Sequence, residues 1–203
     1  FSESIGEQTL AAKFQKVDFL VLLGAARAMV NNNSAWACSG QNQAYRKSLF
    51  KKVGGFSKIS DQMQGDDSLF LLLCRKNFNI NVSFATDPAS FVVCRTEDDF
   101  ISLLKQRIRW AGDSKIFWKF NIPLYITSIA TLIFNCAFLL ALVLSFFINV
   151  NYFLIIFIFS NKILIETFLL HKTKKIYNRK ISILNTLFWL LLQPIYIVTV
   201  SIS

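Results

Sequence analysis

The sequence predicts an α/β domain followed by three transmembrane α-helices. Short strand-like and helix-like segments alternate in the first part of the chain, and three long apolar runs follow Lys119. Alternating strand and helix patterns are typical of α/β domains, and apolar runs of about 20 residues are long enough to cross a bilayer. We therefore expect one domain over residues 1–114 and a membrane region over residues 115–203.

The composition excludes several classes of protein. Hydrophobic residues make up 54% of the 203 residues, with only 7 Gly and 3 Pro, so a disordered or collagen-like chain is excluded. The net charge is +10, but many Lys and Arg flank the apolar runs, as in membrane proteins, and we expect no nucleic-acid partner. The cysteines are widely spaced and show no zinc-binding pattern, so we expect them to be reduced, as in a cytosol-facing protein: Cys38, Cys74, Cys94 and Cys136.

Periodicity and turn residues place the elements of the first domain. After a short polar lead, helices are expected over about 9–29 and 47–52, from Ser68 to about Asn77, and from the Thr96–Asp99 segment through Trp110. Gly54 and Gly55 end the second helix, since Gly is favoured just past a helix end. Strands are expected over residues 35–39, 79–84 and 90–94.

The membrane region is expected to cross three times, over about 122–147, 152–170 and 183–202. Asn149-Val150-Asn151 would form a tight reversal, and Pro194 a kink in the third crossing. The basic segment His171–Lys180 would lie on the same side as Lys115 and Lys119, because two crossings separate them. The positive-inside rule makes that side cytoplasmic.

Two ionisable residues, Lys162 and Glu166, lie one helical turn apart inside the second predicted crossing. Charged groups are costly there and can mark a functional site. The alternative is a mutually satisfying pair near the cytoplasmic end of the helix.

A pattern of Gln, Arg and Trp directly precedes the membrane region, in Gln106-Arg107-Ile108-Arg109-Trp110. Arg offers a planar fork of donors for phosphate or carboxylate, and Trp offers a flat apolar face on which a sugar ring can stack. This stretch alone leaves two interpretations open. It either binds an anionic leaving group and a sugar, or forms an interfacial helix that anchors in lipid headgroups.

Four short motifs occur in a distinctive order. Gly-x-Asn-x-Ala-Tyr-Arg is followed by Gly-Gly-Phe, by Gly65 and an acid-Asp pair before a Leu-rich helix, and by Gln-x-x-Arg-Trp before the membrane helices. This order resembles the second half of a membrane-bound family 2 glycosyltransferase, as in cellulose, chitin and hyaluronan synthases and their bacterial relatives. The resemblance covers about residues 8–120. The matching residues are Gly40, Asn42, Gly54, Gly55, Asp66, Asp67, Gln106, Arg109 and Trp110.

The resemblance implies an inverting hexosyltransferase-like enzyme with a GT-A α/β fold, of which residues 1–114 would be the C-terminal portion. The catalytic base of the family falls on Asp67, and Asp66 replaces the usual Glu beside it. Gln106, Arg109 and Trp110 would bind the donor pyrophosphate and shape the acceptor end. Arg107, Gly40 and Asn42 are assigned to the same donor- and acceptor-binding set.

The resemblance also implies a cofactor and partners. Mg²⁺ or Mn²⁺ on the donor diphosphate is expected, with its ligands mainly in an Asp-x-Asp motif of the first half of the family domain. No Asp-x-Asp precedes Asp66, and the chain begins with Phe1, so we expect a fragment that is inactive alone and has no complete metal site. The expected partners are a nucleotide sugar, a glycan or lipid acceptor and membrane lipids. The expected location is a bacterial inner membrane, with the catalytic part in the cytoplasm.

Two other classes of function remain open. A transporter subunit would use Lys162 and Glu166 as its intramembrane site, and replacing both with Leu would separate that function from a transferase, which should lose little chemistry. A non-catalytic accessory protein would only bind glycan or lipid. An intact Asp-x-Asp upstream of this chain would argue against the accessory protein.

Overall fold

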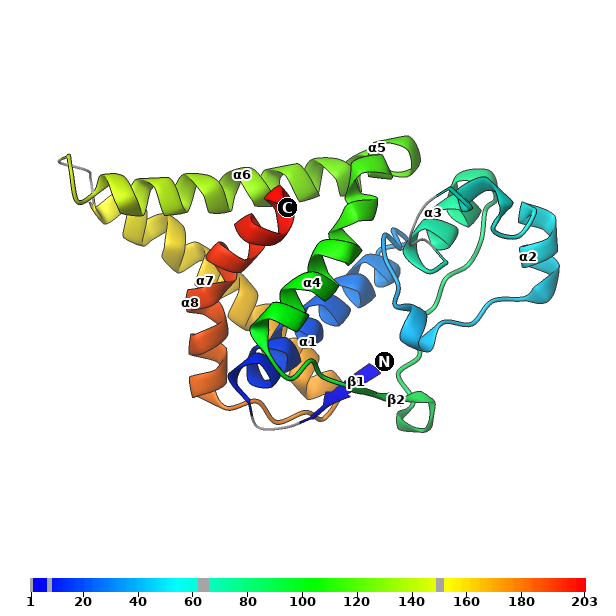
Figure 1. The fold of residues 1–203 in the computed structure, drawn as a ribbon. Helices are drawn as coiled ribbons and strands as arrows, with labels where there is room; N and C mark the ends of the chain where they lie inside the picture. The colour runs from blue at the N-terminus through cyan, green and yellow to red at the C-terminus, as the bar shows by residue number, and fades with distance from the viewer. Residues whose placement is uncertain (1, 7–8, 62–65, 149–151) are drawn as a thin grey trace.

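The computed structural model describes residues 2–6, 9–61, 66–148 and 152–203, and helices dominate them (Figure 1). The helices are α1 (Leu10–Asn31), α2 (Lys47–Val53), α3 (Ser68–Asn77), α4 (Phe100–Ala111), α5 (Phe117–Phe120), α6 (Ile122–Leu144), α7 (Tyr152–Ile176) and α8 (Ile183–Ile202). The strands are β1 (Ser2–Ile5) and β2 (Val92–Arg95), which pair in parallel with Ser2 opposite Val92 and Ile5 opposite Arg95.

The predicted α/β fold is wrong. Only two four-residue strands occur in the described residues, so there is no larger sheet there on which a GT-A α/β domain could be built. Residues 35–39 and 79–84 run without a strand partner in this part of the chain. Alternating polar and apolar residues specify a strand only where a neighbour pairs with the backbone, and Ile80, Val82 and Phe84 instead pack against Val30 of α1 and Leu71 of α3.

Residues that begin or end helices in the structure lie where the sequence predicts helix ends. Thr9 accepts a hydrogen bond from the Ala12 N–H at 3.1 Å and begins α1. Asp99 begins α4, where the Ser102 N–H donates to its carboxylate at 2.8 Å and lowers the pKa of Asp99. Gly54 follows α2 in the left-handed region with φ of 91°, which confirms the predicted end of that helix.

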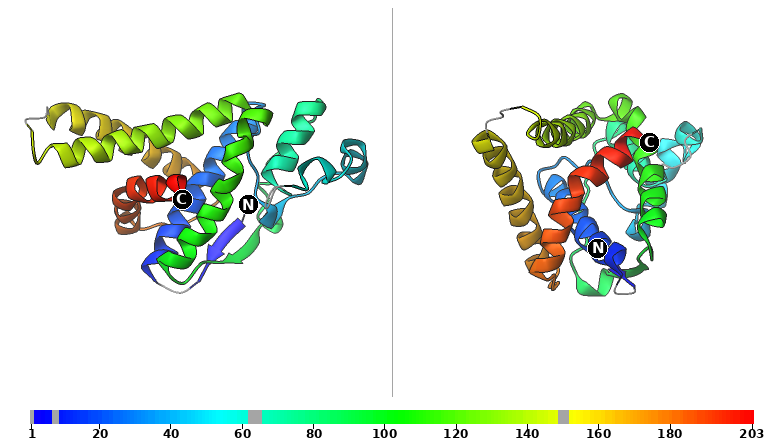
Figure 2. Two further views of the ribbon diagram at one scale, coloured as in Figure 1. Left: turned by 45° about the horizontal axis from the view of Figure 1, so that its top comes forward. Right: turned by 60° about the vertical axis from the view of Figure 1, so that its left-hand side comes forward.

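The long helix α1 lies at the centre of the molecule, with α4, α7 and α8 packed around it (Figures 1 and 2). Phe14 and Val17 of α1, Leu103 of α4 and Trp189 of α8 are all at most 1% exposed and belong to one apolar cluster. A helix surrounded in this way needs apolar residues on most of its faces, as α1 has. Helices α7 and α8, which contribute Leu170 and Trp189, are therefore part of the same core as the first half of the chain.

Two helices of the described residues, α6 and α8, are long and apolar enough to cross a membrane. The prediction of three such helices is corrected to two, because α7 is not among them. Lys162 and Glu166 interrupt its apolar stretch, and its last turns carry Lys174 and Lys175. The predicted reversal at residues 149–151 lies outside the described residues.

The two candidate spans differ in their surroundings. Side chains along α6 are widely exposed, for example Ile126 at 60% and Ile133 at 62%, as expected of a surface that faces lipid. α8 packs on the rest of the molecule and bends near its middle, where Pro194 lies inside the helix (Figure 1). The kink expected at Pro194 therefore has a structural counterpart.

Candidate active site

The acid pair lies at the beginning of α3. Asp67 precedes the helix, and its carboxylate accepts hydrogen bonds from the Ser68 N–H and, at 3.1 Å, from the Gly40 N–H. Asp67 is half-buried, whereas Asp66 is exposed. Five consecutive buried residues, Leu69 to Leu73, fix the helix behind this carboxylate. Asp67 therefore has a fixed backbone and a partly open side chain.

The segment around Gly40 is docked on the start of α3. The Ser68 hydroxyl donates to the Cys38 carbonyl at 3.0 Å and accepts from the Cys38 N–H at 3.2 Å. A Cβ placed on Gly40 would lie 3.4 Å from Asp67 Oδ2, which is ordinary van der Waals contact, so the two residues are close neighbours. Asn42 donates to the Ser90 carbonyl at 2.8 Å. Gly40 thus contacts Asp67 directly, whereas Asn42 contacts the neighbouring segment at Ser90.

Cys38 lies beside the acid pair but is a poor nucleophile. Burial, reinforced by the negative charge of Asp67, raises the pKa of its thiol to about 12. The thiolate is the reactive form of cysteine, and it is scarce at neutral pH when the pKa is this high. The carboxylates are therefore the groups that can accept a proton here.

Two glycines of the matching set have a structural role. Gly54 and Gly55 both have positive φ, at 91° and 63°, and they close the turn after α2. Gly65, which precedes the acid pair in the sequence, lies outside the described residues.

Gln106 of α4 belongs to a small network of amides and a carboxylate. Its Nε2 donates to Glu97 Oε1 at 2.7 Å, and its Oε1 accepts from Gln15 Nε2 at 3.5 Å. Gln15 also accepts the Glu97 N–H at 2.8 Å. These contacts hold the motif helix α4 against α1.

Arg107 is buried in the core, with 3% of its side chain exposed. Its Nη2 lies 3.0 Å from Asp18 Oδ2, and its guanidinium lies over the Trp110 ring at 4.1 Å from the ring centre. Desolvation raises the pKa of Asp18, while the positive charge of Arg107 acts in the opposite direction. The environment of Arg107 is therefore that of an interior ion pair between α4 and α1.

Arg109 and Trp110 occupy the more open part of the motif. Arg109 is exposed, and no hydrogen bond or ion pair of its side chain occurs among the described residues. Trp110 is half-buried and lies 6.3 Å from the Phe19 ring. Arg109 thus presents an open donor fork at the end of α4, while Trp110 packs partly on the core beside Arg107 and Phe19.

The acid pair and the motif helix form two separate groups. No hydrogen bond or ion pair joins Asp66 or Asp67 to the Gln106–Trp110 segment in the part of the chain that the structure describes. A cavity of about 620 Å³ is lined by residues of α1, α2, α3, the segment 37–46 and the segment 80–85, and neither Asp66 nor Asp67 lines it. Ser39 and Asn42 are among its lining residues, which places the Gly-x-Asn motif at the edge of this space.

The carboxylates do not form a metal site by themselves. Within the described ranges, no three side chains of His, Cys, Asp or Glu lie close enough together to hold a metal ion. Asp66 and Asp67 supply oxygen ligands of the kind Mg²⁺ prefers, but two carboxylates are too few for a complete site.

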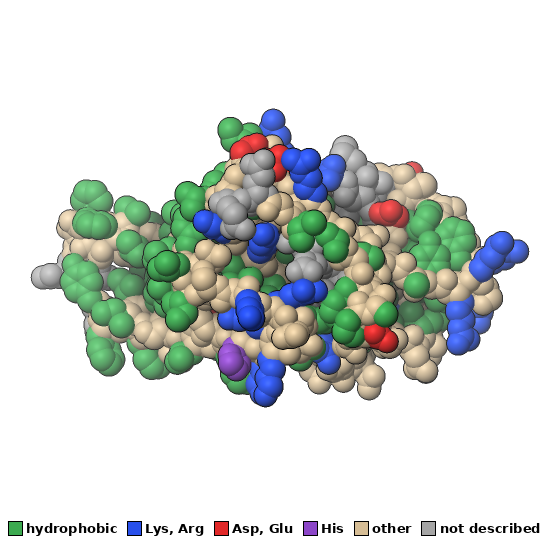
Figure 3. Space-filling view, turned by 90° about the horizontal axis from the view of Figure 1, so that it is seen from below, with side chains coloured by type: hydrophobic (Ala, Val, Ile, Leu, Met, Phe, Trp, Pro, Cys, Tyr) green, Lys and Arg blue, Asp and Glu red, His purple; other side chains and the backbone are tan. Residues whose placement is uncertain are grey.

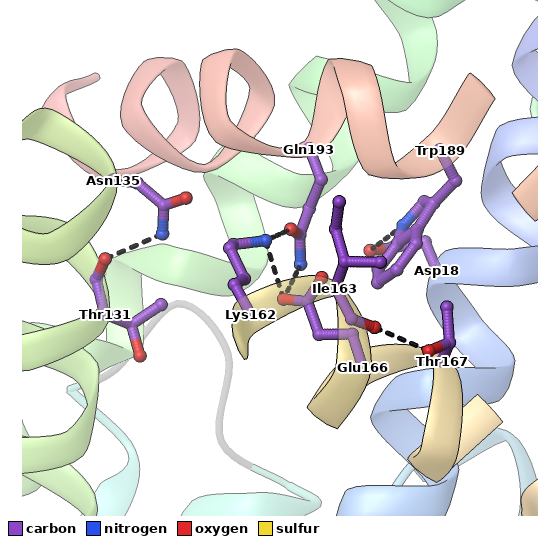
Figure 4. A network of polar contacts seen from close by, with 9 residues as sticks. All are labelled: Asp18, Thr131, Asn135, Lys162, Ile163, Glu166, Thr167, Trp189 and Gln193. Carbon is purple, nitrogen blue, oxygen red and sulfur yellow. Dashed lines mark hydrogen bonds and ion pairs between the residues drawn. The ribbon is translucent and has the colours of Figure 1, made fainter. Parts of the chain in front are cut away.

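Sequence reasoning missed the environment of Asp18. This residue reads as one of the polar positions between the apolar residues of α1, but it is 5% exposed and contacts two further helices. The Trp189 Nε1–H donates to its Oδ1 at 3.4 Å (Figure 4). The Tyr196 hydroxyl donates to its Oδ2 at 3.5 Å. The available signal was its position one turn after Phe14, on the face that the apolar residues of α1 occupy.

The intrahelical pair of α7 is bonded within the protein through one oxygen of Glu166, while Glu166 Oε2 is buried and accepts no hydrogen bond from a described residue. Lys162 Nζ donates to Glu166 Oε1 at 2.7 Å and to Gln193 of α8, and Gln193 Nε2 donates to Glu166 at 3.0 Å (Figure 4). The two charged groups thus bond to each other and to Gln193, as a mutually satisfying pair would, except at Glu166 Oε2. This arrangement offers little to the transporter alternative, because the ammonium is already bound to two acceptors.

Comparison with known proteins identifies the family of this chain. No curated protein and no solved structure matches the chain significantly. The model of a family described as "Glycosyl transferase family group 2" matches residues 4–198, which takes in the acid pair, the Gln106–Trp110 motif and nearly all of α8. The chain belongs to this family of glycosyltransferases.

Proposed function

We propose that the protein takes part in the inverting transfer of a sugar from a nucleoside diphosphate donor to the hydroxyl of a glycan or lipid acceptor, with Asp67 as the general base. The family transfers glycosyl groups, and the match extends through the residues assigned here. The observation that carries the proposal is the position of Asp67. Its backbone is fixed at the start of a buried helix, and its half-buried carboxylate accepts the N–H of Gly40.

The reaction follows from what these side chains can do. The acceptor oxygen bonds to the anomeric carbon of the donor as the bond from that carbon to the diphosphate oxygen breaks, and Asp67 takes the proton of the hydroxyl. The electron pair of the broken bond remains on the diphosphate, whose charge the exposed guanidinium of Arg109 would stabilise. Trp110 would offer its indole to the acceptor sugar.

We propose, from the family resemblance, that a divalent cation binds the donor diphosphate. Asp66 and Asp67 could supply oxygen ligands to it, but no group of three His, Cys, Asp or Glu side chains among the described residues forms a complete site.

The membrane setting supports a lipid-facing location for the transfer. Two helices are long and apolar enough to cross a bilayer, and both pack in the same molecule as the motif helix. We propose that the acid pair faces the cytoplasm, where nucleotide sugars are made, because basic residues collect at the end of α7. Figure 3 shows Lys and Arg side chains around the single His, which is His171.

The test compares two nearly isosteric changes, Asp67→Asn and Asp66→Asn, in the full-length enzyme in membranes. Asn can still accept the Gly40 N–H but cannot take a proton. Asp67→Asn should lower turnover at least ~100-fold with donor binding roughly kept, and Asp66→Asn should be milder. If Asp66→Asn is inactive and Asp67→Asn is active, the base is Asp66 instead of Asp67. If both variants are active, the acid pair has no catalytic role.

A further inference from the structure

Helix α1 presents two polar side chains to the motif helix α4. Gln15 and Asp18 lie three residues apart on one face of α1 and are 4% and 5% exposed. Gln15 bonds to Gln106, and Asp18 pairs with Arg107. Buried polar groups cost free energy unless they are paired, and here both partners come from the same motif.

The Asp18–Arg107 ion pair contacts the half-buried Trp110 through the Arg107 guanidinium. The Arg107 guanidinium lies over the indole at 4.1 Å from its centre and faces the Phe19 ring at 5.8 Å. Tyr196 of α8 also interacts with this guanidinium. The Asp18 carboxylate, the Tyr196 hydroxyl and two aromatic rings therefore surround this flat cation, and the cation covers part of the indole.

The same carboxylate connects to the membrane-spanning candidate α8. Trp189 and Tyr196 both donate to Asp18, at 3.4 and 3.5 Å. Asp18 thus receives donors from α4 and from two turns of α8, and a shift of α8 would move the carboxylate that holds Arg107 (Figure 4 shows the Trp189 contact).

We propose that Asp18 and Arg107 are positioning residues: through Arg107, Asp18 holds the Trp110 indole in the orientation in which it receives the acceptor, and α8 sets the position of Asp18. This inference rests on the proposed role of Trp110 in transfer. It assigns Arg107 to the support of Trp110 and leaves contact with the diphosphate to Arg109.

The variants are chosen so that folding does not decide the outcome. Asp18→Asn alone would leave Arg107 as an uncompensated buried cation, which can unfold the protein. Arg107→Lys keeps the charge and loses the flat stack, and the double change Asp18→Asn/Arg107→Gln leaves no buried charge. Asp98→Asn is the matched control, because its ion pair with Arg95 is exposed, with 75% and 50% of the two side chains accessible.

The measurement is nucleotide release by the full-length enzyme in native membranes, with a panel of nucleoside diphosphate sugars as donors. Arg107→Lys and the double change should each lower kcat about tenfold, the scale of one stacking contact, with the donor KM kept within about twofold. Asp98→Asn should keep the parent values. Arg107→Lys added to Trp110→Ala should lower kcat no further, because its effect acts through the indole.

The outcomes separate this inference from the proposed function. If Trp110→Ala keeps parent turnover, the proposed role of Trp110 is wrong and the inference is overturned with it. If Trp110→Ala is impaired but Arg107→Lys is not, or the losses of the two changes multiply, the pair is only a structural contact and the inference alone is overturned. A rise in donor KM in Arg107→Lys without loss of kcat would also overturn it.

Discussion

Two carboxylates of this chain lie in opposite environments. Asp67 is half-buried at the start of a helix, whereas Asp18 is inside the core and bound to a guanidinium. A carboxylate suits proton transfer when it can meet a substrate, and it suits positioning when its partners are fixed. The surroundings of Asp67 therefore suit it to proton transfer, and those of Asp18 suit it to positioning.

Arg109→Lys in the full-length enzyme should lower transfer about tenfold or more while the domain stays folded. Lys keeps the charge but loses the bidentate fork, and the exposed Arg109 has no described partner in the protein whose loss would destabilise it. Turnover and thermal unfolding are measured together. Parent rates in Arg109→Lys would mean that the end of α4 only anchors in headgroups.

Cys38 should react slowly with iodoacetamide in the folded protein, since its pKa is raised from 9.0 to about 12. In a variant with Cys38 as its only cysteine, the rate should still rise between pH 9 and 11. After unfolding in denaturant it should level off above about pH 9, which serves as the internal control. Because folding favours the thiol, the contribution of Cys38 to stability is present below pH 9 and declines as pH approaches 12. A plateau near pH 9 in the folded protein would contradict the buried environment.

At the scale of the element, α7 shows how a largely apolar helix that also carries a charged pair packs in this fold. It is 25 residues long, packs on α1, and carries a charged pair that Gln193 of α8 completes. The pair is mostly withdrawn from solvent, with side chains 8% and 19% exposed. Such a pair stabilises the protein little compared with apolar residues, but either partner alone is costly.

Lys162→Leu alone should therefore destabilise the protein on the order of 3 kcal/mol, and the double change Lys162→Leu/Glu166→Leu should recover much of that loss. Thermal unfolding in one detergent compares the two variants directly. Glycosyl transfer should be nearly unchanged in the double variant once it is folded. Lost transfer in a stable double variant would instead make the pair part of the functional site.

At the scale of the whole molecule, the helices after Lys119 pack against the first half of the chain. α8 contributes Trp189 and Leu190 to the same core as Phe14, and α6 extends away with exposed apolar side chains. α6 and α7 meet at their far ends, so the start of α6 and the end of α7 lie away from the turn between them (Figure 1). This arrangement places the basic end of α7 near the domain that carries the acid pair.

A topology map checks the orientation. A cysteine introduced at Lys175, in an otherwise cysteine-free full-length protein, should be shielded from an impermeant maleimide in intact cells and labelled after permeabilisation. The positive-inside rule gives the reason, because Lys172, Lys175 and Lys180 are all exposed around this position. A cysteine at Phe146, beyond the far end of α6, is the matched control and should show the opposite pattern. Labelling of position 175 in intact cells would reverse the proposed orientation.

The sequence by itself determined the helices and the family. Thr9, Gly54 and Asp99 act on the backbone within a few residues, so the ends they predict recur in the structure with small shifts. The linear order of the motifs was sufficient for the family, because a motif is a property of the chain and not of its packing.

Only the tertiary structure decided which segments pair and which charges are buried. Residues 79–84 alternate like a strand, but a strand needs a partner backbone, and these side chains pack against helices instead. Arg107 and Arg109 are equivalent as residue types in the motif, yet one is buried against Asp18 and the other is exposed. The difference arises because α1 and α8, distant in the sequence, close over one side of α4 and desolvate the arginine on that side.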